Sequence, residues 1–125
     1  MLRPSLIAAS LAALAGCMET GSAGESAPAG VAITSEAEFR SAIVGRELGF
    51  NGNTFTVNAD GTFSGPWDGN GISGTWSWEN GAFCRTGRAG TRVLERDCQA
   101  WAVNGNTATV TRNRGAGTSF DYTIS

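Results

Sequence analysis

Asn-Gly or Asp-Gly pairs divide the chain at five places after residue 45, and no other feature constrains its fold as strongly. Both residues of such a pair tolerate a positive φ, which makes the pair the strongest short-range signal of a β-hairpin. Between the pairs, apolar residues alternate with polar ones, as in strands with one buried face. The pairs are Asn51-Gly52, Asp60-Gly61, Asp68-Gly69, Asn80-Gly81 and Asn104-Gly105.

This pattern predicts a mainly β fold with about seven or eight short antiparallel strands. Closing the sheet removes exposed strand edges, so we expect a small up-and-down β-barrel or a rolled meander, with an open two-layer sandwich as the alternative. Gly65 and Gly74 lie inside strand runs, where we expect them to let a tryptophan pack over the backbone. The side chains expected to face inward are those of Phe55, Val57, Phe63, Ile72, Trp76, Trp78, Phe83, Trp101, Val103, Ala108, Val110, Phe120, Tyr122 and Ile124.

One short helix is predicted before the strands, over residues 36–44. Ser35 is its N-cap, and Glu38, three residues later, completes a capping box. Gly45 ends the helix. We expect the helix to lie across the sheet or to plug one end of it. Its apolar stripe consists of Phe39, Ala42 and Ile43.

Residues 1–16 have the layout of a secretory signal peptide, with one positive charge, a short apolar run and then small residues. The apolar run is too short to span a bilayer, which takes ~20 residues. The stretch Leu-Ala-Gly-Cys at residues 14–17 resembles the bacterial lipobox. This resemblance implies that the chain is cut before Cys17 and that Cys17 carries lipid on its thiol and its amine. An ordinary signal peptide is the alternative.

Residues 17–30 follow as a lipidated flexible tether of small and polar residues, and residues 31–125 form a single domain. The residue after Cys17 is Met18 and not Asp, which by resemblance to the sorting rule of enteric bacteria favours the outer membrane. We therefore expect a lipoprotein of the bacterial cell envelope. Its lipid anchor would hold it at the outer membrane, with the domain facing the periplasm.

The other two cysteines, Cys84 and Cys98, form an even pair in an oxidising compartment, which favours one disulfide. Such a bond stabilises a domain by on the order of 3 kcal/mol in the chain-entropy model. A metal site or a redox pair is the alternative, disfavoured because the chain has no histidine and no Cys-x-x-Cys motif. We expect neither a metal nor a cofactor.

The chain lacks the residues that most catalytic sites need. It has no histidine, and all nine basic residues are arginines, so Ser-His-Asp, Cys-His and Ser-Lys arrangements are excluded. No phosphate-binding or dinucleotide-binding glycine motif is present. We expect no catalytic residues, although a pair of carboxylates leaves an enzyme open as an alternative. The candidate carboxylates in the β region are those of Asp60, Asp68, Glu79, Glu95, Asp97 and Asp121.

Residues 85–114 carry six arginines against two acidic residues. The planar fork of arginine suits carboxylates and phosphates, so an anionic envelope component or a protein partner is one interpretation; pairing with the domain's own acids is the other. Alternation from Phe83 puts Arg85 on the inner face, where it would hold a buried carboxylate or anchor a ligand at the barrel mouth. No nucleic-acid partner is expected. The candidate binding residues are Arg85, Arg88, Arg92, Arg112, Arg114, Trp76, Trp78 and Trp101.

Several motifs together resemble a family of small secreted bacterial proteins of uncharacterised function. The motifs are GRELGFNGNTFTVNADGTFSG, ISGTWSWENGAFCR and DCQAWAVNGNTATVTRNRGAGTSFDYTI, and the resemblance covers residues 35–125. Some members carry the label dihydrodipicolinate reductase. The residues argue against that activity, because the chain has no nucleotide fingerprint and is too short for a Rossmann domain plus a substrate domain. In architecture alone, the expected barrel is similar to calycin-type barrels, including periplasmic inhibitors of secreted metalloproteases.

The leading interpretation is a non-enzymatic binding or envelope-maintenance domain. A periplasmic protease inhibitor, acting through its tether and barrel rim, is the first alternative, and an enzyme of unknown type is the second. A binding barrel predicts an open apolar cavity near Trp76, Trp78 and Trp101. An inhibitor predicts a filled barrel, and an enzyme predicts a cleft with two convergent carboxylates.

Overall fold

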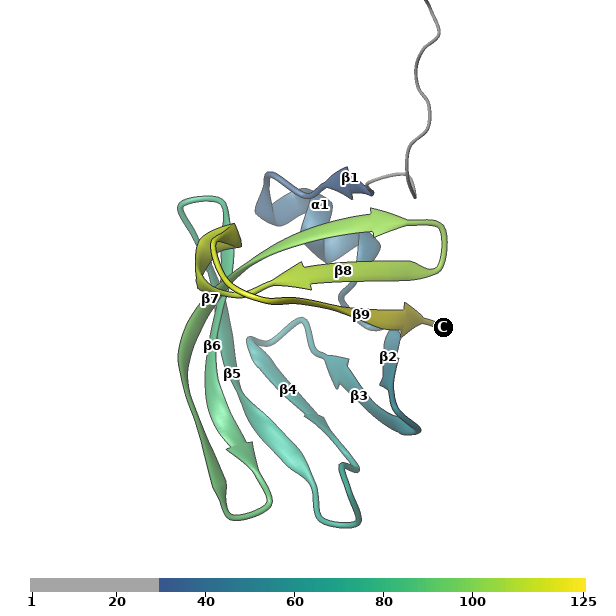
Figure 1. Cartoon of the computed structure of the whole chain (residues 1–125), viewed down its shortest axis with the longest axis vertical. Coiled ribbons are helices and arrows are strands. Elements are labelled where there is room, and N and C mark those ends of the chain that lie inside the picture. The colour runs from purple at the N-terminus through teal and green to yellow at the C-terminus, as the bar shows by residue number, and fades with distance from the viewer. Residues whose placement is uncertain (1–29) are drawn as a thin grey trace, which may run out of the picture.

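The structure, a computed structural model, describes residues 30–125. The predicted signal peptide, Cys17 and the tether up to residue 29 lie outside the described residues. No helix within 30–125 is long and apolar enough to cross a membrane. The elements (Figure 1) are β1 (Val31–Ala32), α1 (Glu36–Ala42), β2 (Glu47–Phe50), β3 (Asn53–Val57), β4 (Thr62–Gly65), β5 (Ile72–Glu79), β6 (Ala82–Ala89), β7 (Arg92–Asn104), β8 (Thr107–Thr111), the short 3₁₀ helix η2 (Asn113–Gly115) and β9 (Ser119–Ile124).

Strands β2 to β9 close into an antiparallel barrel of eight strands, in which each strand pairs with its neighbours in the sequence. The barrel closes where Leu48 of β2 lies opposite Ile124 of β9. The long strand β7 serves two neighbours, since its first part pairs with β6 and its last part with β8. The up-and-down barrel predicted from the turns is therefore confirmed. One strand was not predicted: β1 pairs with β7, with Val31 opposite Val103.

The predicted turn pairs all lie between strands or at a strand end. Asn51-Gly52 and Asn80-Gly81 are two-residue hairpin turns with both residues at positive φ, as a type I′ turn requires. A further tight turn, Gly90-Thr91 between β6 and β7, was not predicted. A glycine followed by another residue also makes two-residue hairpins, of type II′, but it is a weaker signal in a glycine-rich chain.

Helix α1 begins as predicted, at Ser35, whose hydroxyl accepts a hydrogen bond from the Glu38 backbone N–H (3.2 Å). The other half of the capping box is displaced by one residue, because the Glu38 carboxylate accepts from the Thr34 N–H (2.8 Å). The helix also ends earlier than predicted, at Ala42 with Ile43 as its C-cap. The apolar stripe is nevertheless buried, since Phe39 and Ile43 are fully inaccessible to solvent.

Phe39 plugs one end of the barrel. Its ring centroid lies 5.0 to 5.5 Å from those of four other aromatic rings. We call this packed region, where α1 meets the barrel, the closed end; it consists of Phe39, Trp76, Trp78, Phe83 and Trp101. The remaining core also follows the predicted alternation, because every side chain predicted to face inward is buried in the core or packed against it.

Two glycines face each other across β5 and β6 and make room for a ring. Gly74 lies opposite Gly87. A Cβ atom on Gly74 would lie only 2.6 Å from the Phe63 ring, and one on Gly87 2.9 Å. Gly74 was predicted to let a tryptophan pack over the backbone. It makes room instead for the phenyl ring of Phe63 on β4. Gly65 instead approaches the backbone of β3, where a Cβ atom would lie 2.6 Å from the Phe55 Cα atom.

Candidate functional site

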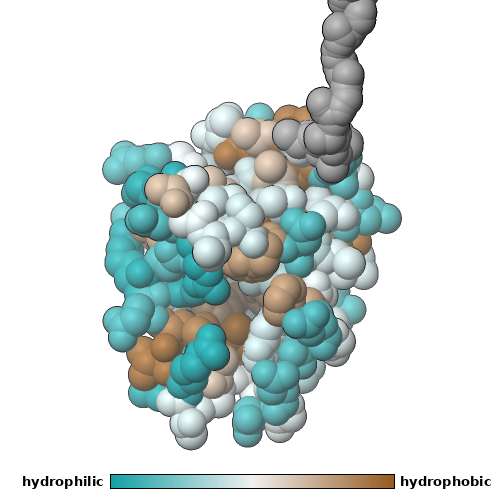
Figure 2. Space-filling view, in the orientation of Figure 1, coloured by the Kyte–Doolittle hydropathy of each residue, from teal (hydrophilic) through white to brown (hydrophobic). Residues whose placement is uncertain are grey.

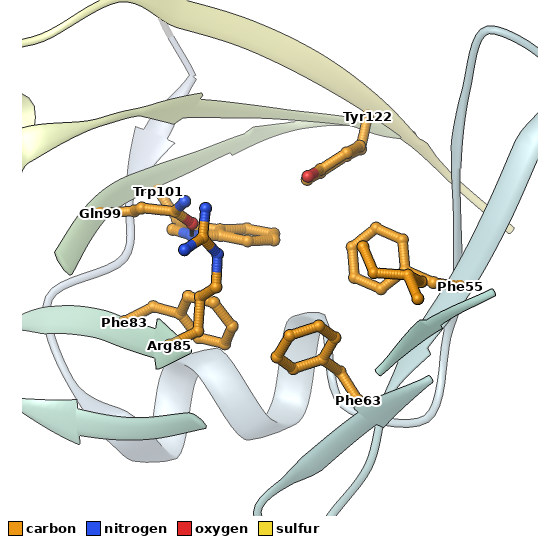
Figure 3. Close-up of a pocket in the computed structure, with 8 residues that line it drawn as sticks. Phe55, Phe63, Phe83, Arg85, Gln99, Trp101 and Tyr122 are labelled. Atoms are coloured by element: carbon orange, nitrogen blue, oxygen red, sulfur yellow. Dashed lines mark hydrogen bonds between the residues drawn. The ribbon is translucent and has the colours of Figure 1, made fainter. Parts of the chain in front are cut away.

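A half-enclosed cavity lies inside the barrel, next to the closed end. Figure 2 shows the hollowed face of the molecule, with hydrophobic residues visible between hydrophilic flanks in its lower half. The centre of a water molecule can move through about 30 Å³ of the cavity. The residues that line it (Figure 3) are Phe55, Phe63, Ile72, Phe83, Arg85, Gln99, Trp101 and Tyr122.

Three further aromatic residues pack beside the cavity, on β2, after β4 and on β9. Phe50 and Trp67 stack with their ring planes 3° apart, and Phe50 meets Phe120 edge to face. Phe50 and Phe120 both contact the ring of Tyr122, which lines the cavity. We call the cavity and these neighbours the open end. Phe83 and Trp101 line the cavity but also belong to the closed end. The residues that belong to the open end alone are Phe50, Phe55, Phe63, Trp67, Ile72, Arg85, Gln99, Phe120 and Tyr122.

Arg85 is the charged residue in the cavity wall. It follows Phe83 by two residues on β6, so both side chains face inward, as predicted. Figure 3 shows its guanidinium directed into the cavity. Its Nη1 donates a hydrogen bond to the backbone carbonyl of Glu95 (2.6 Å), at a bulge where the register of β6 and β7 shifts. Burial lowers the pKa of the Arg85 guanidinium, because the charged form loses hydration, and the nearby carboxylate of Asp97 opposes the shift.

Asp97 lies directly opposite Arg85 in the register, yet the two form no ion pair within residues 30–125. Three other groups occupy the Asp97 carboxylate. One oxygen accepts from the Gln99 side-chain amide (2.9 Å) and lies 3.5 Å from Arg112 Nη1, and the other accepts from the Asn113 backbone N–H (3.1 Å). One role predicted for Arg85 was to hold a buried carboxylate, and no carboxylate of the described residues pairs with it. The other predicted role, to anchor a ligand, stays a prediction.

Gln99 is fixed in orientation by its neighbours. It is 3% exposed, its amide nitrogen donates to Asp97, and its carbonyl oxygen accepts from the Trp101 indole N–H (3.2 Å). The carbonyl of Gln99 is thereby occupied, whereas its amide group has a second N–H to offer. This chain of hydrogen bonds holds one wall of the cavity in place.

Tyr122, on β9, faces Arg85 from the other side of the cavity (Figure 3). Burial raises the pKa of its phenol to about 12, although the positive charges of Arg85 and Arg112 act in the opposite direction. Its ring centroid lies 5.1 Å from that of Phe55. Among the residues that the structure describes, none forms a hydrogen bond with the Tyr122 hydroxyl.

Three of the six arginines of residues 85–114 lie on the inner face of the sheet, namely Arg85, Arg92 and Arg112. Residues paired across a sheet share a face, and Arg92 lies opposite Ala89, four residues from Arg85 on β6. Arg112 follows β8 and places its guanidinium over the Phe120 ring, 5.1 Å from the centroid. The charges of Arg92 and Arg112 both disfavour the charged form of Arg85, although both residues are exposed to solvent and neither lines the cavity.

The other three arginines of residues 85–114, Arg88, Arg96 and Arg114, lie on the outer face. Arg96 binds the Glu79 carboxylate (2.8 Å), which lowers the pKa of Glu79 to about 2. Arg114 donates to the backbone carbonyls of Glu79 and Asn80. Arg88 is exposed. The predicted group of Arg88, Arg92, Arg112 and Arg114 is therefore divided between two faces and is not one surface.

The predicted tryptophans are divided as well. Trp101 lines the cavity, as expected of a binding barrel. Trp101 also packs on Phe39, as do Trp76 and Trp78, which are not among the residues that line the cavity. The Trp76 indole donates to the Asn58 backbone carbonyl (2.9 Å). Their place in the fold gives them a packing role.

The predicted disulfide lies on the outside of the barrel wall. Cys84 and Cys98 are directly opposite each other on β6 and β7, and their sulfurs are bonded. Cys84 is 1% exposed, and its neighbours in sequence, Phe83 and Arg85, both line the cavity. The bond therefore joins the two strands that carry much of the cavity wall.

Gln99 and Tyr122 were not among the predicted site residues. Alternation back from Trp101 puts Gln99 and Asp97 on the inner face, so the signal for them was a polar residue at an apolar position. Tyr122 was predicted to face inward as part of the core, with no role for its hydroxyl. A buried tyrosine hydroxyl usually has a hydrogen-bond partner. Applied to an inward-facing Tyr122, this rule would have identified the residue as a candidate for ligand binding.

No group of three or more potential metal-ligating side chains occurs within residues 30–125. Comparison with protein-family models, with curated proteins and with solved structures finds no match to this chain.

Proposed function

We propose that the chain is a lipid-anchored protein of the bacterial cell envelope whose barrel binds a small molecule at its open end. The observation that carries the proposal is the half-enclosed cavity, which is walled by aromatic rings and contains an arginine without an acidic partner among the described residues. Small-molecule sites are typically apolar cavities with a few convergent polar groups. The inhibitor alternative expects a filled barrel, so this cavity favours binding.

The position of β1, where the described residues begin, fits an anchored binding protein. The Leu-Ala-Gly-Cys motif supports a lipid on Cys17, and the segment from there leads into β1. Figure 1 shows β1 beside α1, at the end of the barrel remote from the β6–β7 turn. A tether that enters beside α1 leaves the open end clear of the anchor.

The binding part of the proposal is tested by NMR on the mature chain, residues 17–125, with Cys17→Ser to omit the lipid. Small ligands, both neutral and charged, are titrated while the side-chain N–H signals of Trp101 and Trp76 are followed. We expect at least one ligand to move the Trp101 signal, which comes from the cavity wall, and to leave the Trp76 signal in place. Ile72→Phe, which fills the cavity, should abolish the response. If no ligand moves the Trp101 signal, the binding proposal is wrong.

The anchor is tested separately, in cells that express the full chain. A fatty acid with a chemical handle should label the wild-type protein, and Cys17→Ser should abolish the labelling and release the protein from the membrane fraction. Equal labelling of the variant would contradict the anchor.

A further inference from the structure

Each polar side chain that lines the cavity still has a hydrogen-bond donor to offer. A guanidinium has five N–H groups, and the Glu95 carbonyl accepts from Nη1 of Arg85. The carbonyl of Gln99 already accepts from Trp101, so what Gln99 still offers is an N–H. The Tyr122 hydroxyl adds an O–H. A molecule that satisfies this wall must therefore bring acceptors.

The electrostatics of the open end select for a negative charge. Arg92 and Arg112 add positive charge near Arg85. The carboxylate that opposes them, that of Asp97, is already held by Gln99, Arg112 and a backbone N–H. Burial destabilises the charged form of Arg85, and an anion beside it would restore what the lost hydration provided. A neutral acceptor would offset less of that cost.

The size and the walls of the cavity limit the anion. About 30 Å³ accessible to a water centre has room for a few heavy atoms, and aromatic rings make up most of the wall. A carboxylate matches the planar fork of one guanidinium through two parallel hydrogen bonds. A phosphate with two charges would leave one of them unpaired against aromatic rings. The geometry favours a single negative charge on a small apolar body.

We infer that the open end binds the carboxylate of a small monoanion, with Arg85 donating two hydrogen bonds to it and Tyr122 a third. The inference rests on the proposed binding function and specifies its ligand class. The apolar part of the ligand lies against Phe55 and Phe63, and a longer body leaves through the half-enclosed mouth. The carboxylate can belong to a short free acid or to the end of an envelope peptide, and the same donors serve both.

The test compares matched ligands on the mature chain with Cys17→Ser. Butyrate and butyramide have nearly the same shape, but only butyrate is charged. We expect butyrate to move the Trp101 and Arg85 side-chain N–H signals and to bind ~10-fold or more tightly than butyramide, as for one lost charge-assisted hydrogen bond or more. N-acetylalanine presents the carboxylate of a peptide end, and the tighter of the two acids indicates the source.

Three variants connect the effect to the guanidinium. Arg85→Gln should weaken butyrate binding by ~10-fold or more, and Arg85→Lys, which keeps the charge but loses the fork, by a smaller factor. Arg88→Gln, on the same strand and the outer face, is the matched control and should leave the affinity unchanged. An unmoved Trp76 signal checks that each variant is folded.

The outcomes separate the two proposals. Butyramide binding as tightly as butyrate, or Arg85→Gln binding butyrate like the wild type, overturns the carboxylate inference and leaves the binding function standing. Inorganic phosphate binding more tightly than butyrate also overturns it. If neither butyrate, butyramide nor any other small ligand moves the Trp101 signal, the proposed function fails together with the inference.

Discussion

The two ends of the barrel are built from the same alternating strands, but they use their aromatic residues differently. At the closed end, Phe39 from α1 fills the space between four rings, and the indole N–H groups of Trp76 and Trp101 are hydrogen-bonded to Asn58 and Gln99. At the open end no element enters the barrel, and Arg85 and Tyr122 face the space that remains. The strands are alike at both ends. The difference is that α1 covers the aromatic rings at the closed end, whereas no element within residues 30–125 covers those at the open end.

This contrast assigns separate tasks to the two ends. Packing at the closed end supplies stability, because buried aromatic area and ring contacts stabilise the folded state. A partly desolvated charge at the open end does the opposite and is tolerated where it serves a function. Substitutions at the two ends should therefore change the free energy of unfolding by different amounts, and even in opposite directions.

The largest effect is expected from Phe39→Ala. Removing a fully buried ring that touches four others should lower the free energy of unfolding by about 3–5 kcal/mol. Phe120→Ala at the open end is the matched change, and since Phe120 is only half-buried it should cost less than half as much. Urea unfolding of both variants measures the difference, and equal losses would contradict the division between the ends.

The next effect is expected from replacing Cys84 and Cys98 together by serine. Opening the bond should lower the stability by on the order of 3 kcal/mol, because the unfolded chain is no longer constrained. The cavity wall is held by the β6–β7 hydrogen bonds as well, so the folded variant should still respond to butyrate. A stable variant without that response would show that the disulfide shapes the open end.

A small effect of the opposite sign is expected from Arg85→Met. Replacing a partly buried charge by an apolar chain removes the desolvation cost but also the hydrogen bond to the Glu95 carbonyl. We expect a stability equal to the wild type or up to about 1 kcal/mol higher. A loss of more than about 1 kcal/mol in urea unfolding would mean that Arg85 is a structural residue.

The smallest effect concerns acid. The Glu79 pKa is lowered to about 2 by Arg96, so this carboxylate contributes stability that is present above its ordinary value of 4.5 and is lost as the pH falls towards 2. Both side chains are exposed, and the contribution should be small. Glu79→Gln should flatten the acid limb of the stability curve slightly and leave butyrate binding unchanged. A shift in butyrate affinity would couple the outer face to the cavity.

Most of the fold is readable from the sequence because its signals are local. Positive φ at Asn51-Gly52 and Asn80-Gly81, the alternation between them and the cap at Ser35 are each decided within a few residues. The missed turn at Gly90-Thr91 shows the limit, since its glycine is one of eighteen. The two-residue strand β1 is held by pairing with Val103 and has no pattern of its own.

The site was less predictable, because it depends on which end the helix covers. Alternation alone places Arg85 and three of the four tryptophans inside, but it cannot say that Phe39 meets Trp76 and leaves the other end open. The division of the arginines between two faces depends on the bulge in β7 and on the path of the chain after β8. Such relations join residues far apart in the sequence, and no local pattern encodes them.

Tyr122 provides a direct report from the open end, because it is the single tyrosine of the chain. Its pKa is raised to about 12 in the folded state, against an ordinary value of about 10. A raised pKa means that the folded state holds the proton more tightly, so this contribution to stability is present below pH ~10 and is lost as the pH rises towards 12. The phenolate absorbance must therefore be read directly after a pH jump, before the chain unfolds.

The most direct test of the account is this titration of Tyr122 with and without butyrate. We expect a midpoint near pH 12 for the unliganded chain, a higher midpoint with butyrate because a bound carboxylate disfavours the phenolate, and no change with butyramide. Arg85→Gln should raise the unliganded midpoint, since the Arg85 charge lowers it in the wild type, and should abolish the response to butyrate. A midpoint near 10 that neither butyrate nor Arg85→Gln moves would contradict the account of the open end.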